Sequence, residues 1–155
     1  LLVRRATQPS AQDELSADER ADKRSYLVGL LSVRLGDSSA VSMAQAALSE
    51  HADRGSRLAV PFREALSGQW QLRSDNYVNA EAAFTNAIPD IPARLRTRYP
   101  ALAQHHDRLG YARVLQQLVK RDEASRWFAS LREGAGIASA PYVAAADSGL
   151  RATRR

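Results

Sequence analysis

The fold is decided by a stretch that reads Gly68-Gln-Trp-Gln-Leu-Arg-Ser-Asp-Asn-Tyr77-Val-Asn-Ala80-Glu-Ala-Ala-Phe84-Thr-Asn-Ala87. Its spacing Ala-x3-Phe recurs in Arg121-Asp-Glu-Ala124-Ser-Arg-Trp-Phe128, and residues 28–48 repeat the layout without an aromatic residue. A pattern that recurs along a chain indicates stacked helix–turn–helix units instead of one unique core. Such stacks mostly hold partners, so the pattern favours a binding function over a catalytic one.

The composition fits a single all-α domain. Of the 155 residues, 45% are hydrophobic but only 6% are aromatic, which is typical of helices packed through alanine and leucine. The absence of cysteine excludes disulfides, thiolate metal sites and cysteine nucleophiles. The apolar run from Tyr26 to Leu31 is too short to span a membrane. We expect a cytoplasmic protein, with a mature exported protein as the alternative.

Helix start and stop signals predict where the helices lie. Ser16 and Glu19 form a capping-box pattern, and Gly36 supplies the left-handed conformation that a helix end prefers. Pro61 fits the first turn of the third helix, and Asp122 is expected to cap the sixth. The expected helices cover residues 17–35, 39–52, 57–73, 77–87, 101–119, 122–132 and 142–152. We expect residues 1–15 to be a linker or the tail of a preceding segment, and residues 16–155 to form one helical-repeat domain.

The repeated pattern resembles the tetratricopeptide repeat (TPR) family, over roughly residues 20–133. That family places a small residue where two helices cross, an alanine on the second helix, and an aromatic residue one turn later. The matching residues are Gly68, Tyr77, Ala80, Phe84 and Ala87 in the middle unit; Gly29, Ala40, Ala44 and Ala47 in the first; and Ala112 (or Gly110 with a longer turn), Ala124 and Phe128 in the third. The equivalent alanines Ala40, Ala80 and Ala124 stand farther apart than the family's repeat of about 34 residues, which indicates insertions in the connectors.

The resemblance implies an all-α fold, a right-handed stack of about three antiparallel hairpins with a closing C-terminal helix. It also implies that the first helix of each pair lines a concave face on which a protein or peptide lies. The residues assigned to that face are Lys23, Tyr26, Leu30, Arg34, Gln69, Leu72, Arg73, His106, Leu109, Arg113 and Gln116. Family members that clamp a terminal carboxylate use paired Lys and Asn, whereas this chain has Tyr26 and Leu30 in those places.

Two groups of arginines are candidates for binding an acidic partner. Arg34, Arg73 and Arg113 would rise one above another on the concave face, where guanidinium groups pair well with carboxylates. The connector carries a second group at alternate positions, Arg94, Arg96 and Arg98, which suits nucleic acid or an acidic protein surface. The alternative for both groups is ordinary solvated charge. The net charge of +5 is spread along the chain, unlike the concentrated charge of a dedicated nucleic-acid domain.

The sequence gives little support for catalysis, a cofactor or a metal. His105 and His106 are adjacent on a helix and point about 100° apart, so they do not share one ion. Gly134-Ala-Gly136 follows a helix and lacks the Lys-Ser/Thr of a phosphate loop. We therefore expect a non-enzymatic scaffold. Two alternatives stay open. The chain could be a structural subunit packed in a larger protein or complex, or a regulatory module that contacts nucleic acid. The oligomeric state is open too.

Overall fold

A computed structural model describes residues 15–87, 104–132 and 140–153 of the chain. Within these ranges the chain forms helices and turns and no strand, which confirms the all-α prediction. The helices are α1 (Ala17–Leu35), α2 (Ser38–Asp53), α3 (Ala59–Arg73), α4 (Tyr77–Thr85), α6 (His105–Gln117), α7 (Arg121–Ser130) and α8 (Ala140–Thr153). None of these helices combines the length and the apolar character needed to cross a membrane.

Local signals in the sequence set both ends of α1. The Ser16 hydroxyl accepts from the Glu19 amide, and the Glu19 carboxylate accepts from the Ser16 amide at 2.8 Å, so the capping box is formed. Gly36 ends α1 with a φ of 77°, as expected for a left-handed helix stop. The cap predicted for the sixth helix is wrong. α7 already begins at Arg121, because the chain turns tightly at Val119 with a φ of 61°, and Asp122 lies inside its first turn.

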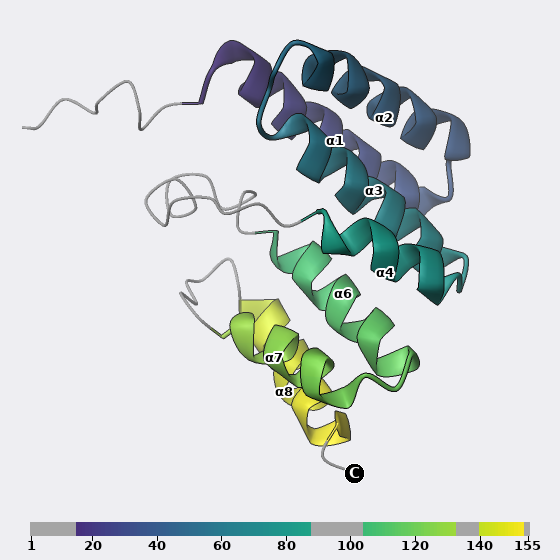
Figure 1. Cartoon of the computed structure of the whole chain (residues 1–155), viewed down its shortest axis with the longest axis vertical. Helices are drawn as coiled ribbons and strands as arrows, with labels where there is room; N and C mark the ends of the chain where they lie inside the picture. The colour runs from purple at the N-terminus through teal and green to yellow at the C-terminus, as the bar shows by residue number, and fades with distance from the viewer. Residues whose placement is uncertain (1–14, 88–103, 133–139, 154–155) are drawn as a thin grey trace, which may run out of the picture.

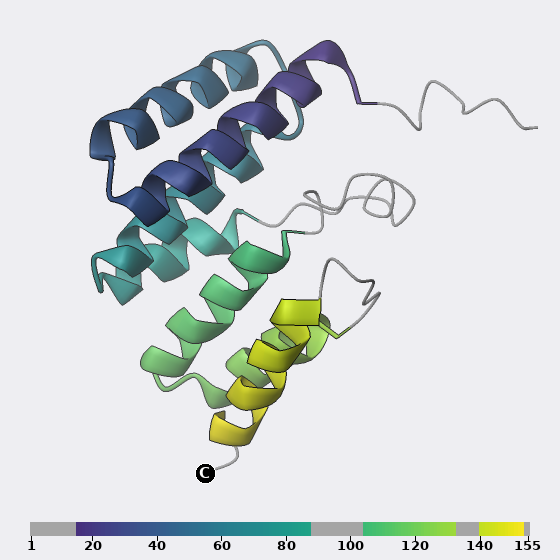
Figure 2. The same cartoon turned by 180° about the vertical axis from the view of Figure 1, so that it is seen from behind.

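Consecutive helices pack as antiparallel pairs, α1 with α2, α3 with α4, and α6 with α7 (Figure 1). The first helices α1, α3 and α6 also contact one another in that order, and each second helix contacts the first helix of the next pair. α8 packs on both α6 and α7 at the C-terminal end of the row (Figure 2). The neighbours in space are therefore mostly neighbours in sequence, as they are in repeat proteins.

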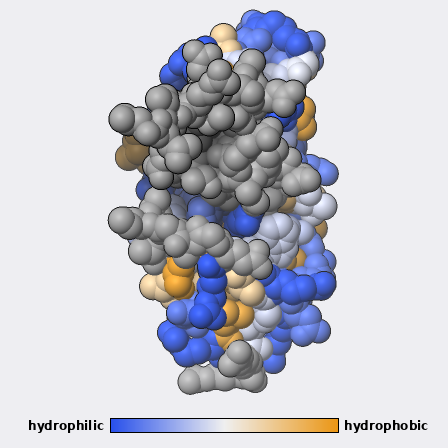
Figure 3. Space-filling model, turned by 90° about the vertical axis from the view of Figure 1, so that its left-hand side faces the viewer, coloured by the Kyte–Doolittle hydropathy of each residue, from blue (hydrophilic) through white to orange (hydrophobic). Residues whose placement is uncertain are grey.

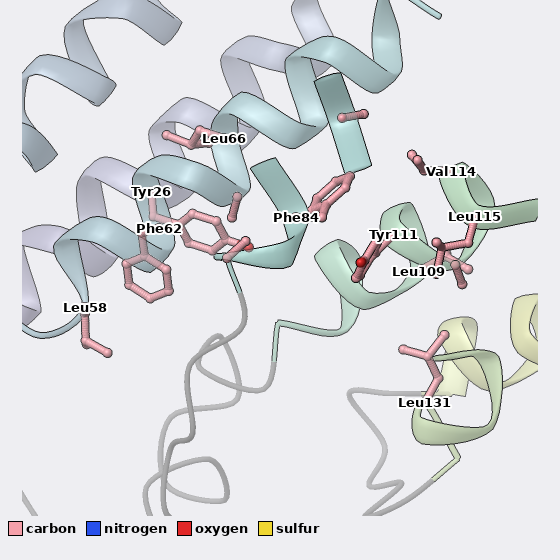
Figure 4. Packing of buried hydrophobic residues seen from close by; sticks show 14 of the residues in the cluster. Tyr26, Leu58, Phe62, Leu66, Phe84, Leu109, Tyr111, Val114, Leu115 and Leu131 are labelled. Atoms are coloured by element: carbon pink, nitrogen blue, oxygen red, sulfur yellow. The ribbon is translucent and has the colours of Figure 1, made fainter. Parts of the chain in front are cut away.

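Aromatic side chains fill the spaces between helices and continue from one pair to the next. Tyr26 of α1 stacks on Phe62 of α3 with ring centroids 4.3 Å apart. Phe84 of α4 and Tyr111 of α6 stack at 5.7 Å, and Tyr111 also meets Trp127 of α7 at 5.0 Å. Offset aromatic pairs of this kind add to the apolar area they bury. Figure 4 shows the rings of Tyr26, Phe62, Phe84 and Tyr111 among the aliphatic side chains of one continuous core.

Small residues let the paired helices approach closely. A Cβ atom added at Gly68 would lie 2.8 Å from the Phe84 ring, and one added at Gly29 would lie 3.2 Å from the Ala44 methyl group. Gly29 and Gly68 thus occupy the helix-crossing positions that the sequence assigns to them. In the third pair Gly110 faces Phe84 of the preceding pair, whereas Ala112 is fully buried. Ala112 stands as far before Ala124 as Gly68 does before Ala80, which favours Ala112 as the third crossing residue.

Both ends of the described chain pack against the core. Leu15 is buried and belongs to the core cluster, so the folded domain includes at least this last residue of the predicted linker. The other residues of that linker lie outside the described ranges. At the opposite end, the Tyr142 ring of α8 packs against the core and stacks on the His105 ring of α6 at 5.7 Å.

Candidate functional site

Three of the predicted arginines lie close together on one face of the molecule. Arg34 is in the last turn of α1, Arg73 is the last residue of α3, and Arg113 is in α6. Arg73 Nη1 donates to the Arg34 carbonyl at 3.1 Å, and the same guanidinium group packs over Gly36. Arg34 and Arg113 both act electrostatically on His106, which places them around this imidazole. We call Arg34, Arg73, His106 and Arg113 the arginine face.

The positive charge of the arginine face is not neutralised by the described residues. All three arginines are exposed, and no described carboxylate lies within ion-pair distance of any of them. Ion pairs form elsewhere, for example between Arg57 and Glu19 and between Lys120 and Glu81. A guanidinium group has five N–H donors, of which Arg73 gives one to the Arg34 carbonyl. Within the described part of the chain, most donors of this face are therefore available to bind an anion.

His106 is held neutral at the centre of this face. Burial lowers the pKa of its imidazole first, and the charges of Arg34 and Arg113 lower it further, to about 4. Its carbonyl accepts from Gln69 Nε2 at 3.3 Å, which ties α6 to α3. Near neutral pH the imidazole is therefore uncharged, and an anion bound between the arginines would be expected to raise its pKa.

The remaining residues predicted for the concave face divide into two groups. Tyr26, Gln69 and Leu109 are buried, which corrects their assignment to a partner-binding surface. Their side chains fill the junction of α1, α3 and α6, because these first helices pack directly on one another. The second group is half-buried and consists of Lys23, Leu30, Leu72 and Gln116; Leu30 and Leu72 pack against the core.

Sequence reasoning missed a buried carboxylate at the junction of the first helices. Asp107 of α6 is fully buried and accepts hydrogen bonds from the Tyr26 hydroxyl, from Gln69 Nε2 at 2.9 Å and from Gln104 Nε2 at 3.2 Å. Burial raises the pKa of Asp107 to about 6, and the three donors partly oppose this rise. The donors come from three separate parts of the chain, so no local sequence signal reveals the cluster.

A second buried carboxylate fixes the first pair of helices. Asp22 of α1 accepts from the Ser56 hydroxyl and lies 2.5 Å from His51 Nδ1. These contacts join α1, the last turn of α2 and the loop before α3. Asp22 is fully buried and these contacts satisfy its carboxylate, so we assign the cluster to stability.

Neither the hollow on α7 nor the hydropathy of the surface in Figure 3 indicates a binding site. A hollow of about 400 Å³ on α7 is lined by residues of that helix alone, which are Glu123, Arg126, Trp127 and Ser130. In Figure 3 the described surface is mainly hydrophilic, and hydrophobic residues gather low on that side, at the height of α7 and α8.

Among the described residues no three His, Cys, Asp or Glu side chains gather as a metal site would require. Arg94, Arg96 and Arg98 lie outside the described ranges.

Comparison of this chain with protein-family models, with curated proteins and with solved structures found no match. The likeness to tetratricopeptide repeats is therefore a resemblance of sequence pattern. The described residues themselves supply an all-α row of helix pairs and a face of unpaired arginines. Function has to be inferred from these two features.

Proposed function

We propose that this chain is a non-enzymatic scaffold, built as a TPR-like α-solenoid, that holds a protein or extended peptide with acidic side chains on its arginine face. The observation that carries the proposal is the gathering of three arginines without a carboxylate partner among the described residues: Arg34 and Arg113 lie around His106, and Arg73 is bonded to the Arg34 carbonyl. Guanidinium groups bind carboxylates with strong, directional hydrogen bonds, and excess positive charge speeds the approach of an acidic partner.

The arrangement of the helices supports this proposal. The three arginines come from α1, α3 and α6, which are the first helices of the three pairs. An extended ligand that follows this row would meet one arginine from each pair. The half-buried side chains of Leu30 and Leu72 belong to two of the same helices, so a ligand that mixes acidic and apolar residues suits this face.

The test is a change of charge on this face with a matched control. A random peptide library is selected on the wild-type protein, and the affinity of an enriched peptide is compared with a variant in which Arg34, Arg73 and Arg113 are all changed to Ser. We expect enriched peptides to carry Asp or Glu and to bind the variant at least about tenfold more weakly, about 1.4 kcal/mol. The binding of those peptides to the wild type should also weaken as salt is added.

The control variant changes Arg121, Arg126 and Arg132 to Ser, which removes the same charge from α7 and the turn that follows it. Its affinity should stay within about twofold of the wild type, because long-range attraction alone is screened at ordinary salt. Undiminished capture by the first variant, with its helical content preserved, would move the site off the arginine face.

A structural role in a larger assembly is the second candidate function. It is favoured by four large apolar side chains of α1 that face solvent. Large apolar patches on a protein surface commonly mark a place where another chain packs.

A further inference from the structure

The outer side of α1 carries an apolar stripe. Leu27, Val28, Leu31 and Leu35 are 46%, 58%, 58% and 73% exposed. Their spacing places them on one side of the helix, while Tyr26, Gly29 and Val33 are buried on the other. We call these four exposed residues the α1 stripe. A surface helix normally keeps polar residues on this side, so the stripe needs a physical explanation.

In α3 and α6, the first helices of the second and third pairs, the equivalent side of the helix packs against the preceding pair. Relative to the crossing residues Gly29, Gly68 and Ala112, the residue two positions earlier is Leu27 in α1, Leu66 in α3 and Gly110 in α6. Leu66 is fully buried and packs directly on Gly29 of the preceding pair. Gly110 lies against Phe84 of the preceding pair, since a Cβ atom added there would meet the ring at 3.1 Å. The next position, equivalent to Val28, holds Tyr111, which stacks on the same ring.

The same relation holds at the C-terminal end. Phe128 of α7 packs onto Gly149 of α8, where an added Cβ would lie 2.4 Å from the ring. Phe84 meets Gly110 of α6 in the same way, and Ala124 precedes Phe128 as Ala80 precedes Phe84. Thus α3, α6 and α8 each present this side to a preceding helix. Only α1, within the described residues, presents it to solvent.

Charge adds information about what would cover the stripe. Towards the N-terminus of α1 the same side of the helix continues with Arg20 and Arg24, both of them exposed. The acidic residues of α1 lie elsewhere, since Glu19 and Asp22 are buried and Asp18 is more than a quarter turn away. A second copy of this chain would bring arginines towards arginines. An apolar helix with acidic residues beside its apolar face would complement both parts of the side.

We propose that the α1 stripe is a docking surface for an amphipathic helix with acidic flanking residues, supplied by a partner protein, in the place that a preceding helix pair would occupy. The helix adds one more layer to the row of helices and buries Leu27, Val28, Leu31 and Leu35, while its acidic residues face Arg20 and Arg24. This surface is distinct from the arginine face, and the inference does not rest on the binding of an acidic peptide there.

The test uses a synthetic amphipathic peptide with leucines along one face of its helix and glutamates beside them. Its affinity for the whole chain is measured by fluorescence anisotropy, and a peptide with lysines in place of the glutamates serves for comparison. The stripe variant combines Leu31→Ala with Leu35→Ala. Alanine keeps the helix propensity, and both side chains are exposed, so the variant should keep its helical content. The control variant combines Met43→Ala and Val78→Ala, two equally exposed apolar residues on α2 and α4.

We expect the glutamate peptide to bind the wild type and the control variant alike, and to lose at least tenfold in affinity with the stripe variant. We expect the lysine peptide to bind more weakly than the glutamate peptide. The variant lacking Arg34, Arg73 and Arg113 should still bind the glutamate peptide, because Arg20 and Arg24 are intact. If the variant lacking Arg34, Arg73 and Arg113 does not bind the glutamate peptide, the peptide lies on the arginine face and the inference is wrong.

Two other results would overturn it. The first is a wild-type protein that is monomeric by sedimentation velocity and does not bind the glutamate peptide. The second is a wild-type dimer that the stripe variant converts to monomer, which would show that a second copy of the chain occupies the α1 stripe.

Discussion

Asp107 shows how a single residue can couple the stability of this protein to pH. Its carboxyl group is fully buried, and burial raises its pKa from 3.8 to about 6. The folded state then binds more protons than the unfolded state between about pH 4 and pH 6. The contribution of Asp107 to the free energy of unfolding therefore falls as the pH rises through this window, by about 3 kcal/mol in all.

We predict that Asp107→Asn removes this dependence. The wild type should lose about 2.4 kcal/mol of unfolding free energy relative to the variant between pH 4 and pH 7, as measured by urea unfolding across that range. His106 titrates in the same window with the opposite sign, because its lowered pKa favours protonation of the unfolded state. Its effect is common to both proteins and cancels in the difference. A difference that stays flat with pH would contradict the proposed burial of an ionisable carboxyl group.

His106 reports on the arginines around it. Their charges contribute to its low pKa of about 4, after the larger effect of burial. We predict that changing Arg34 and Arg113 to Ser raises this pKa but leaves it below the ordinary 6.5, because burial remains. Imidazole chemical shifts followed against pH measure the change. An unchanged pKa in a folded variant would mean that the two arginines do not lie beside His106.

The residue scale also shows the limits of sequence reasoning. Ser16, Glu19 and Gly36 act on backbone within a few residues of themselves, so their roles as caps could be read directly from the sequence. The surroundings of Asp107 could not be read in this way. Tyr26 lies 81 residues away in the chain, and its contact with Asp107 exists only after α1, α3 and α6 have packed.

At the scale of the helix pairs, close approach depends on small residues at the crossings. We predict that Gly68→Ala destabilises the protein by about 2 kcal/mol, because the new Cβ would lie 2.8 Å from the buried Phe84 ring and force the helices apart. Thermal unfolding followed by circular dichroism measures this loss. Gly55→Asn is the control, since nothing lies within 4 Å of that position and asparagine tolerates its φ of 85°. Equal melting temperatures for the two variants would argue against the close crossing of α3 and α4.

Most of the helices could be predicted because their apolar spacing and end signals are local. α1 runs from Ala17 to Leu35 as expected, and the other helices begin or end within a few residues of the prediction. The start of α7 was missed because Val119 adopts a positive φ, which is rare for a β-branched residue and has no sequence signal. The choice between Gly110 and Ala112 also needed the structure, since both are small and only their neighbours distinguish them.

At the scale of the whole molecule, each of the three first helices carries one arginine of the arginine face. Arg34 and Arg73 each stand five residues after the crossing glycines Gly29 and Gly68, so the repeat pattern predicts that these two share a face. Arg113 stands one residue after Ala112, so its place beside His106 comes from the structure and not from the repeat. The sequence overestimated the width of that face. Tyr26, Gln69 and Leu109 were assigned to it from the repeat pattern, yet direct packing among α1, α3 and α6 buries them. The α1 stripe was not recognised from the sequence, because its apolar spacing resembles that of a buried helix side.

The central claim is that an acidic ligand lies along the first helices on the arginine face. The most direct measurement is a titration of isotope-labelled protein with an acidic peptide selected on the wild type, following the backbone amide and arginine side-chain resonances by NMR. We predict that the largest shifts fall on the guanidinium groups of Arg34, Arg73 and Arg113 and on the amides of α1, α3 and α6 near them. Shifts confined to α2, α4 and α7, with these arginines unaffected, would contradict the account.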